Sequence, residues 1–266
     1  MSQMHHFSRV LPVLALSTLA LTGCAAQTAS TAAPTAAPTP SSAPAHWNYQ
    51  GSEGPAHWAG LSDENSTCGA GQRQSPIDLP RVGSGAPIDL SVPAAVVEGT
   101  TADNGHTVQL TVGDGETTVV DGVEYHLQQL HFHAGSEHTV RGERSPIELH
   151  FVHADADGNL LVIGVFGKVG ADNPAFDAYV RGAHGDAEEW ATVDLGRMLP
   201  AERSYWSYDG SLTTPPCTEG VRWVVLATPV ELGQEQVDAL TEAHDDNARP
   251  TQALHGRTVH SGGAQG

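Results

Sequence analysis

The chain has 266 residues, with 12 lysines and arginines against 31 aspartates and glutamates, and a formal net charge of −19. That charge repels nucleic acid and anionic lipid headgroups, which argues against nucleic-acid binding and against direct binding to a membrane surface. A hydrophobic share of 39% allows a sizeable core, and the length fits one large domain or two small ones. Skewed genome composition explains the single lysine, Lys168, at least as well as a saline habitat does.

Residues 1–24 have the pattern of an export signal. A weakly basic start precedes an apolar run from Val10 to Leu21, which is too short to span a membrane comfortably. The run ends in Leu-Thr-Gly-Cys at residues 21–24, which resembles a bacterial lipobox. We therefore expect lipidation of Cys24 and a cell-envelope lipoprotein, anchored to the membrane only through that lipid. An ordinary cleaved signal with an incidental cysteine is the alternative.

Residues 25–45 are rich in alanine, threonine, proline and serine. Such a tract cannot bury a core and is typical of an extended linker. Trp47 and Tyr49 mark the beginning of the folded part, and no second linker or repeat follows them. One domain over residues 46–266, in the periplasm or outside the cell, is therefore predicted.

Strand patterns dominate that domain. Alternation with a period of two, rich in β-branched residues, occurs at 106–112, 117–133, 147–153, 160–167 and 221–228. Helical patterns are few, at about 173–183 and 233–244. Sequential strands with short turns predict a mainly β fold of the α+β type. We expect a large, twisted, mostly antiparallel central sheet with short helices at its edges.

Two of these predicted strands carry three histidines in a pattern that indicates a metal site. His131 and His133 are two residues apart and share one face of a strand, and His150 lies on the next predicted strand. Two neighbouring strands could direct the three imidazoles at one point. Three neutral nitrogens leave a tetrahedral zinc ion one open position, which is typical of a catalytic site. A buried polar layer is the alternative, but three histidines on one buried face are hard to satisfy without a cation.

Two further polar residues make the cluster more specific. Gln129 and Glu148 each lie two residues before one of the histidines, on the same face. A ligating histidine usually donates its other ring N–H to an acceptor that fixes its tautomer. We expect Gln129 and Glu148 to be such acceptors.

The chain resembles the alpha class of carbonic anhydrases. Six blocks occur in that family's order and at compatible spacings, over roughly residues 46–260. They are Gln74 to Asp78, Asn104 to His106, Gln129 to His133, Ser136 to Thr139, Glu148 to His153 and Ser211 to Cys217. The resemblance implies an enzyme that reversibly hydrates carbon dioxide to bicarbonate and a proton by means of zinc-bound hydroxide. It also implies that sulfonamides and anions inhibit, with weak esterase activity as a side reaction.

The family's zinc ligands match His131, His133 and His150. Thr213 matches a threonine that accepts a hydrogen bond from the hydroxide and donates its own proton to a carboxylate, and Glu137 matches that carboxylate. This chain of bonds would position the attacking oxygen.

The resemblance assigns roles around this centre as well. His106 matches the histidine that carries the product proton away, while Asn247 matches the residue whose carbonyl supports the middle ligand. Polar positions that order water match Tyr49, Asn104 and Gln109. The positions that form the pocket for carbon dioxide match Val152, Val162, Leu212, Val221, Trp223 and Thr214. For the apolar members of this set, ordinary core packing explains the sequence nearly as well. Ala134 and Ala154 replace tryptophans that are common in animal members.

Exported members of the family often form a disulfide at the positions of Cys68 and Cys217, and an exported chain permits this bond. Two free buried thiols are the alternative. The activity has two alternatives: a binding module that has lost catalysis, and a zinc esterase for which hydration is incidental. The intact histidines, Thr213 and Glu137 argue against the binding module. Either a monomer or a homodimer fits the sequence.

Overall fold

The computed structural model describes residues 45–263 apart from 82, 84, 114 and 183–188. The predicted signal, Cys24 and all but the last residue of the predicted linker lie outside these ranges. Internal contacts divide the chain into Met1–Ser42 and a second compact unit, Ala43–Gly266, which holds every element described below. In the described ranges, no helix has both the length and the apolar character needed to cross a membrane.

The described residues form thirteen strands and five α-helices. The strands are β1 (Asp78–Leu79), β2 (Leu90–Ser91), β3 (Val96–Asp103), β4 (Val108–Val112), β5 (Thr117–Val120), β6 (Val123–Ala134), β7 (Thr139–Val140), β8 (Ile147–Ala154), β9 (Leu160–Val169), β10 (Glu189–Asp194), β11 (Ser204–Ser211), β12 (Glu219–Leu232) and β13 (His260–Gly263). The helices are α1 (Trp58–Leu61), α2 (Thr67–Ala70), α3 (Asp177–Gly182), α4 (Leu195–Met198) and α5 (Gln234–Ala243). Short 3-10 helices cover Gly51–Glu53, Asp63–Asn65 and Pro174–Phe176.

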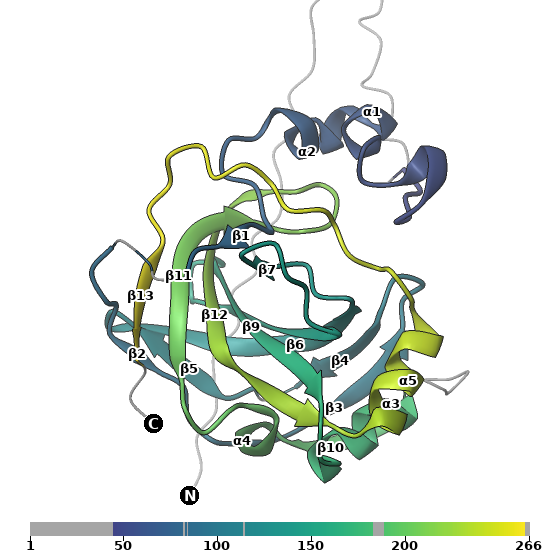
Figure 1. The fold of residues 1–266 in the computed structure, drawn as a ribbon, viewed down its shortest axis with the longest axis vertical. Coiled ribbons are helices and arrows are strands. Elements are labelled where there is room, and N and C mark those ends of the chain that lie inside the picture. The colour runs from purple at the N-terminus through teal and green to yellow at the C-terminus, as the bar shows by residue number, and fades with distance from the viewer. Residues whose placement is uncertain (1–44, 82, 84, 114, 183–188, 264–266) are drawn as a thin grey trace, which may run out of the picture. The chain divides into compact units, whose positions relative to one another are not determined.

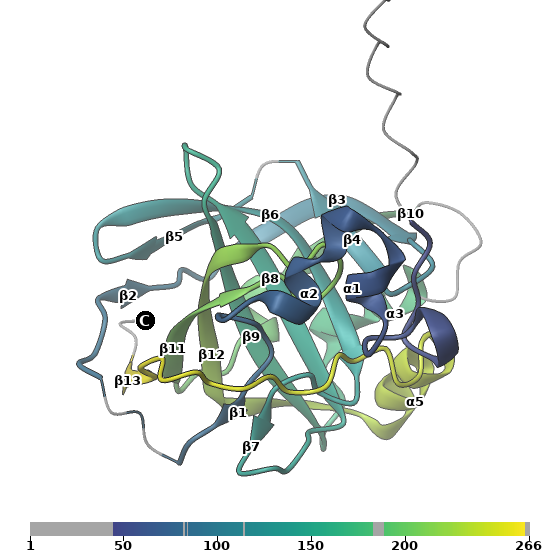
Figure 2. The ribbon, with the colours of Figure 1, turned by 90° about the horizontal axis from the view of Figure 1, so that it is seen from above.

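One large sheet organises the domain (Figure 1). Across it the strands follow the order β10, β3, β4, β6, β8, β9, β12, β11, β13, and β5 pairs with both β6 and β2, giving eleven strands in the described residues. All recorded pairs in this sheet are antiparallel except β9 with β12. The expectation of a mainly β fold around a mostly antiparallel sheet with peripheral short helices is confirmed. Figure 2 shows α3 and α5 near one end of the domain and β2 and β13 near the opposite end.

The prediction of one strand over 117–133 is wrong. The structure has a hairpin there, in which β5 and β6 are joined by Asp121 and Gly122. Both residues have positive φ, at 51° and 81°. A two-residue loop with two positive φ angles matches the right-handed twist of the paired strands, and Asp-Gly is a preferred sequence for it.

Other element boundaries also differ from the sequence pattern. The strand expected from residue 106 begins at Val108, because residues 104–107 form a turn. The helix expected over 173–183 is a 3-10 helix, Pro174–Phe176, followed by α3. Strands β3, β10 and β11 were not predicted; glycine, serine and threonine interrupt the apolar alternation of β3 and β11.

The sheet separates two apolar clusters. Leu130 and Phe132 of β6 and Leu149 of β8 belong to the larger one, together with residues of α3 and α5. Burial of each such side chain stabilises the fold by about 1.5–3 kcal/mol. Because side chains alternate along a strand, the residues between them on β6 and β8 face the opposite side, where the histidines lie.

Candidate metal centre

The pairing of β6 with β8 brings the three histidines together. Their antiparallel register places His131 opposite His150 and His133 opposite Glu148. The ring centroids lie 5.2 Å apart for His131 and His133, 5.1 Å for His131 and His150, and 4.6 Å for His133 and His150. One nitrogen of each ring lies within 4.8 Å of the other two. Three ligand atoms therefore converge on one point beside the sheet.

Hydrogen bonds fix the orientation of the two outer rings. Nδ1 of His131 lies 2.8 Å from Oε1 of Gln129, and Nε2 of His150 lies 2.9 Å from Oε1 of Glu148. Since both oxygens are acceptors, these nitrogens carry the protons. Nε2 of His131 and Nδ1 of His150 then keep their lone pairs for a metal ion. Both acceptors are the residues singled out from the sequence.

His133 is held by the backbone instead. Its Nδ1 donates to the carbonyl oxygen of Asn247 at 2.6 Å, which leaves Nε2 with the lone pair. That Nε2 is buried and has no hydrogen-bond partner among the described residues. A buried polar atom without a partner is rare and costly, and a cation bound by the three nitrogens would satisfy it. The residues present therefore fit a zinc ion.

The electrostatics of the centre keep these rings neutral. Burial, reinforced by the neighbouring rings of His150 and His133, holds the pKa of His131 well below its usual value. Burial also lowers the pKa of His133, although the charge of Glu137 opposes this. A histidine must be neutral to bind a metal ion, so both shifts favour binding near neutral pH.

Glu137 and Thr213 are both buried beside this centre. Oε1 of Glu137 accepts the backbone N–H of Arg249 at 2.8 Å, and Oε2 lies 3.5 Å from Nε2 of His133 and 4.0 Å from Nδ1 of His150. Within the described part of the chain Oε2 has no hydrogen-bond partner. No hydrogen bond from the Thr213 hydroxyl to Glu137 is found among the described residues, so the expected bond stays a prediction.

A network behind His150 was not foreseen from the sequence. Glu148 accepts from His138 as well, at 2.7 Å from Nδ1 and 2.8 Å from the backbone nitrogen. Nε2 of His138 lies 2.7 Å from the hydroxyl of Tyr208, which donates to Oγ of Ser75 at 2.9 Å. Burial would raise the pKa of Glu148, but its interactions with His138 and His150 hold that pKa well below its usual value. Glu148 is thereby kept as a charged acceptor.

A cavity of about 130 Å³ leads to the histidines. Its lining consists of Trp47, Tyr49, Asn104, His106, Thr107, Gln109, Gln129, His131, His133 and Thr214. The polar positions expected to order water and to carry the proton are thus all found in one space with two of the histidines. Asn104 has a further role, since its Oδ1 accepts the backbone N–H groups of His106 and Thr107, both at 3.0 Å.

His106 lies at the mouth of this cavity and is only partly buried. Its ring stacks on Trp47, with centroids 3.7 Å apart and planes 10° apart. Burial, together with the charges of His46 and His244, lowers its pKa, and Asp103 only partly opposes this. Its backbone carbonyl accepts from Nδ2 of Asn247 at 2.9 Å, so one residue anchors both His106 and the ligand His133.

The apolar residues assigned to the substrate pocket lie together on the histidine side of the sheet. Val162, Val221 and Trp223 are buried in the second apolar cluster, against which Val152 and Leu212 pack. The ring centroid of Trp223 lies 4.9 Å from that of His150. An apolar wall therefore borders the metal centre, while Thr214 lines the polar cavity.

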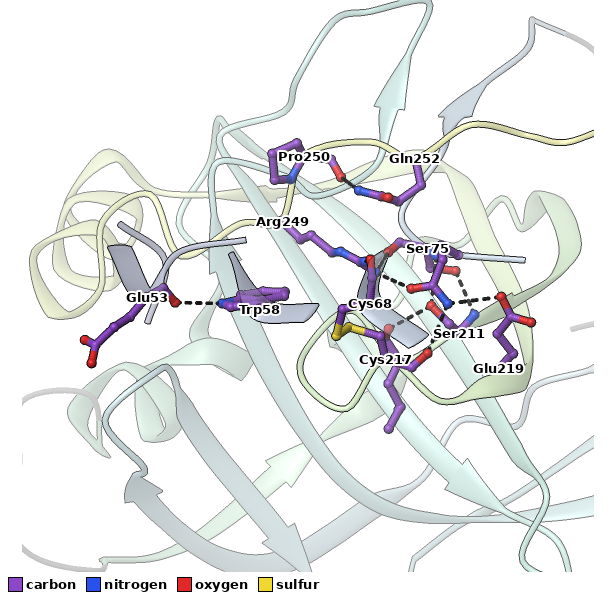
Figure 3. The surroundings of a disulfide bond; sticks show 12 residues. Glu53, Trp58, Cys68, Ser75, Ser211, Cys217, Glu219, Arg249, Pro250 and Gln252 are labelled. Atoms are coloured by element: carbon purple, nitrogen blue, oxygen red, sulfur yellow. Dashed lines mark hydrogen bonds between the residues drawn. A yellow bond between two sulfur atoms is a disulfide. The ribbon is translucent and has the colours of Figure 1, made fainter. Parts of the chain in front are cut away.

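A disulfide between Cys68 and Cys217 joins the N-terminal segment to the loop that holds Thr213 (Figure 3). Nε2 of Gln74 donates to the carbonyl of Cys217 at 3.0 Å. The buried guanidinium of Arg249 donates to the side chain of Gln74 and to the carbonyls of Ser75 and Cys68. This region is therefore tied together by a covalent bond and by one central arginine.

Sequence reasoning missed the roles of four residues at the site. They are Trp47, Thr107, His138 and Arg249. His138 stands inside a block that carries the family resemblance, and Arg249 follows the ligand-supporting Asn247 by two residues, which was a usable signal. The stacking of Trp47 on His106 joins segments 59 positions apart, and nothing in the local pattern indicates it.

Comparisons with known proteins agree on one family. A family model described as eukaryotic-type carbonic anhydrase matches residues 53–262. A carbonic anhydrase of Pectobacterium atrosepticum is 40% identical over 221 residues, which cover 80% of this chain and 90% of the relative. The solved complex of an alpha-carbonic anhydrase from Thermovibrio ammonificans with the inhibitor sulfanilamide has a TM-score of 0.76 and 42% identity, and covers 82% of this chain and all of that one. Dioscorin complexed with ascorbate is more distant in sequence, with a TM-score of 0.73 and 28% identity over 83% of this chain and 99% of that one.

Proposed function

Because the chain belongs to the alpha-class, eukaryotic-type carbonic anhydrase family, we propose that it hydrates carbon dioxide with a zinc ion held by His131, His133 and His150. The observation that carries this proposal is Nε2 of His133, which is buried, directed at the other two rings and without a partner among the described residues. When bound, zinc supplies a Lewis acid that lowers the pKa of a coordinated water.

The residues around the ion hold protons at defined atoms. Gln129 and Glu148 keep the protons of the outer rings on the nitrogens that face away from the centre, and the Asn247 carbonyl does the same for His133. Fixed tautomers present the lone pairs without rearrangement when the ion binds.

Thr213 and Glu137 are proposed to orient the attacking oxygen. Oε2 of Glu137 is a buried acceptor that needs a donor, and the Thr213 hydroxyl is the donor that the family resemblance assigns. Once Thr213 donates to Glu137, its own oxygen can only accept, which selects one orientation of the group it contacts. The apolar wall of Val162, Val221 and Trp223 would receive carbon dioxide, which is apolar.

His106 is proposed to carry the product proton to solvent. It lines the same cavity as His131 and His133 and is partly exposed at the mouth. An imidazole near its ordinary pKa can both accept and release a proton near neutral pH. The lowered pKa of His106 favours release to solvent.

The test of this proposal measures zinc content and carbon dioxide hydration on the same purified samples. His133→Ala should lose most of its zinc and nearly all hydration activity. His126→Ala removes an exposed histidine of the same strand and should keep both. Full activity in a metal-free preparation would falsify the proposal.

Sulfonamide binding offers a second test. We propose that sulfanilamide, which is bound to the Thermovibrio ammonificans relative, occupies the open metal position here as well. Hydration and any ester cleavage should then be lost in parallel as the inhibitor is added. Ester cleavage that persists when hydration is fully inhibited would point to a separate esterase site.

Export and anchoring form a separate proposal. The disulfide supports export, because such bonds persist in oxidising compartments. We propose that Cys24, outside the described residues, carries the lipid. Cys24→Ser should move the protein from the membrane fraction to the soluble fraction, with Cys68→Ser as the control for loss of a cysteine. A wild-type protein without lipid would show that the signal is an ordinary cleaved one.

A further inference from the structure

A second cavity lies beside strands β11, β12 and β13, which contribute Ser207 to Asp209, Arg222 and His260 to its lining. Its volume is about 590 Å³, and it shares no lining residue with the cavity that leads to the histidines. No step of the proposed reaction uses it. Its walls combine charged side chains with a short apolar segment, Ala86 to Ile88.

This cavity concentrates cations in a chain that has few of them. Arg73, Arg222 and Arg257 line it together with His260, although the whole chain has only 12 lysines and arginines and a formal charge of −19. The two carboxylates in the lining belong to Asp121 and Asp209. Three guanidinium groups therefore face two carboxylates, and the local excess of positive charge attracts anions into the cavity.

Several donors in the cavity remain available. The guanidinium of Arg73 forms no ion pair or hydrogen bond recorded among the described residues, whereas its backbone N–H donates to Glu219. Arg222 pairs with Asp121 through Nη2 alone, at 2.5 Å. A guanidinium carries five N–H donors, so both arginines can still bind an oxyanion.

Arg257 and His260 are held rigidly. The Arg257 guanidinium donates to the backbone carbonyls of Gln74, Asp209, Ala253 and Leu254, and lies 5.4 Å from the ring centroid of Tyr208. Carbonyls leave its positive charge uncompensated. Nδ1 of His260 donates to the carbonyl of Ala86 at 2.7 Å.

Gly85 shows how closely the backbone packs on His260. A Cβ atom at Gly85 would lie 2.3 Å from the ring of His260, so only glycine permits this packing. The ring is thus fixed from two sides. The guanidinium of Arg257 is held just as rigidly, so it loses little entropy when an anion binds beside it, and such preorganisation raises affinity.

We propose that this cavity is a binding site for a small oxyanion, either phosphate or a carboxylate, held by Arg73 and Arg222 beside the fixed charge of Arg257. Planar guanidinium groups match the geometry of both anions. The segment from Ala86 to Ile88 gives room for a short apolar substituent on the ligand. This site is independent of the proposed hydration reaction.

The test titrates the zinc-loaded full chain with sodium phosphate and, separately, with sodium acetate, against sodium chloride at equal ionic strength. Binding is measured by calorimetry and by the rise in melting temperature. Arg73→Glu should weaken binding by at least about tenfold, because it replaces a charge-assisted donor with a like charge. Arg181→Glu, an equal charge change at an exposed position on α3, should leave the affinity unchanged.

Two further variants separate this site from the metal centre and from folding effects. His133→Ala should retain anion binding, since phosphate bound at the metal would be lost with the metal. Arg222→Gln, on a different strand, should also weaken binding if Arg73→Glu proves too unstable to measure. Dependence on Arg73 or Arg222 for either anion supports the site and identifies its ligand class. Binding no stronger than that of chloride, or equal in all arginine variants, overturns it.

Discussion

The proposed zinc ligands on strands β6 and β8 are held differently from His106 at the cavity mouth. Each proposed ligand ring has one nitrogen fixed by a hydrogen bond to an acceptor in or behind the sheet. In the described structure, neither ring nitrogen of His106 makes such a bond, and the ring instead stacks on Trp47. Groups that must keep one geometry are placed by sheet register. His106, which is proposed to exchange protons with water, lies on a turn outside the sheet.

Removal of the disulfide should have the largest effect, because this bond connects the region of the cavity mouth to the sheet. It closes a loop of about 150 residues, for which chain entropy gives an upper estimate of about 5 kcal/mol. In Cys68→Ser, or with reductant, the melting temperature of the zinc-loaded protein should fall by about 10 °C. Scanning calorimetry measures this, with Cys24→Ser as the control. Melting that is unaffected by reductant would show that the bond does not stabilise the domain.

Removal of the acceptors should weaken the positioning of the histidines on the sheet. Gln129→Ala and Glu148→Ala should each weaken zinc binding by about 10- to 100-fold, because the ring behind each acceptor loses its fixed tautomer. Competition with a chelator measures the affinity. Gln128→Ala changes the exposed neighbour of Gln129 and should have no effect. An equal loss in Gln128→Ala would mean that the strand, and not the acceptor, is responsible.

Replacement of His106 should affect proton transfer and spare the attack on carbon dioxide. In weak buffer His106→Ala should lower kcat by at least about tenfold and leave kcat/KM nearly unchanged. Added imidazole should restore much of the lost kcat. His57→Ala, at an exposed position outside the cavity lining, is the control. Equal losses in both parameters without rescue would assign His106 a structural role.

Trp47→Ala should produce the smallest effect, and it tests how the cavity mouth sets the pKa of His106. Burial lowers the pKa of His106, so exposing its ring should raise that pKa towards the ordinary value. His106 accepts a proton only when neutral, so kcat should begin to fall at a higher pH as the solution is acidified. The same substitution added to His106→Ala should shift nothing; a shift there would point to another titrating group.

The sequence predicted those parts of the site that depend on strand periodicity. His131, His133 and His150 were identified because their spacing puts them on one face, and β6 and β8 pair in the register that this requires. The cavity lining was placed correctly only through the family resemblance. Trp47 was used as a domain boundary, and its contact with His106 depends on tertiary packing.

Two errors have physical causes in the local chain. Asp121 and Gly122 break the alternation over 117–133 for only two residues, too few to interrupt the pattern visibly. Strands β3 and β11 escaped prediction because small residues occupy positions that the sheet buries.

The span of the disulfide sets an order of events during biosynthesis. Its two cysteines are 149 positions apart, and the proposed zinc ligands His131, His133 and His150 all lie between them. When a chain is threaded N-terminus first into an oxidising compartment, every ligand arrives before Cys217 does. The three rings can therefore meet the metal while the cysteines are still reduced. Asn247, which holds His133, arrives only after Cys217, so the centre is completed at about the stage at which oxidation joins the Thr213 loop to the N-terminal segment. A cell that supplies zinc only after oxidation would load this protein through the cavity mouth instead.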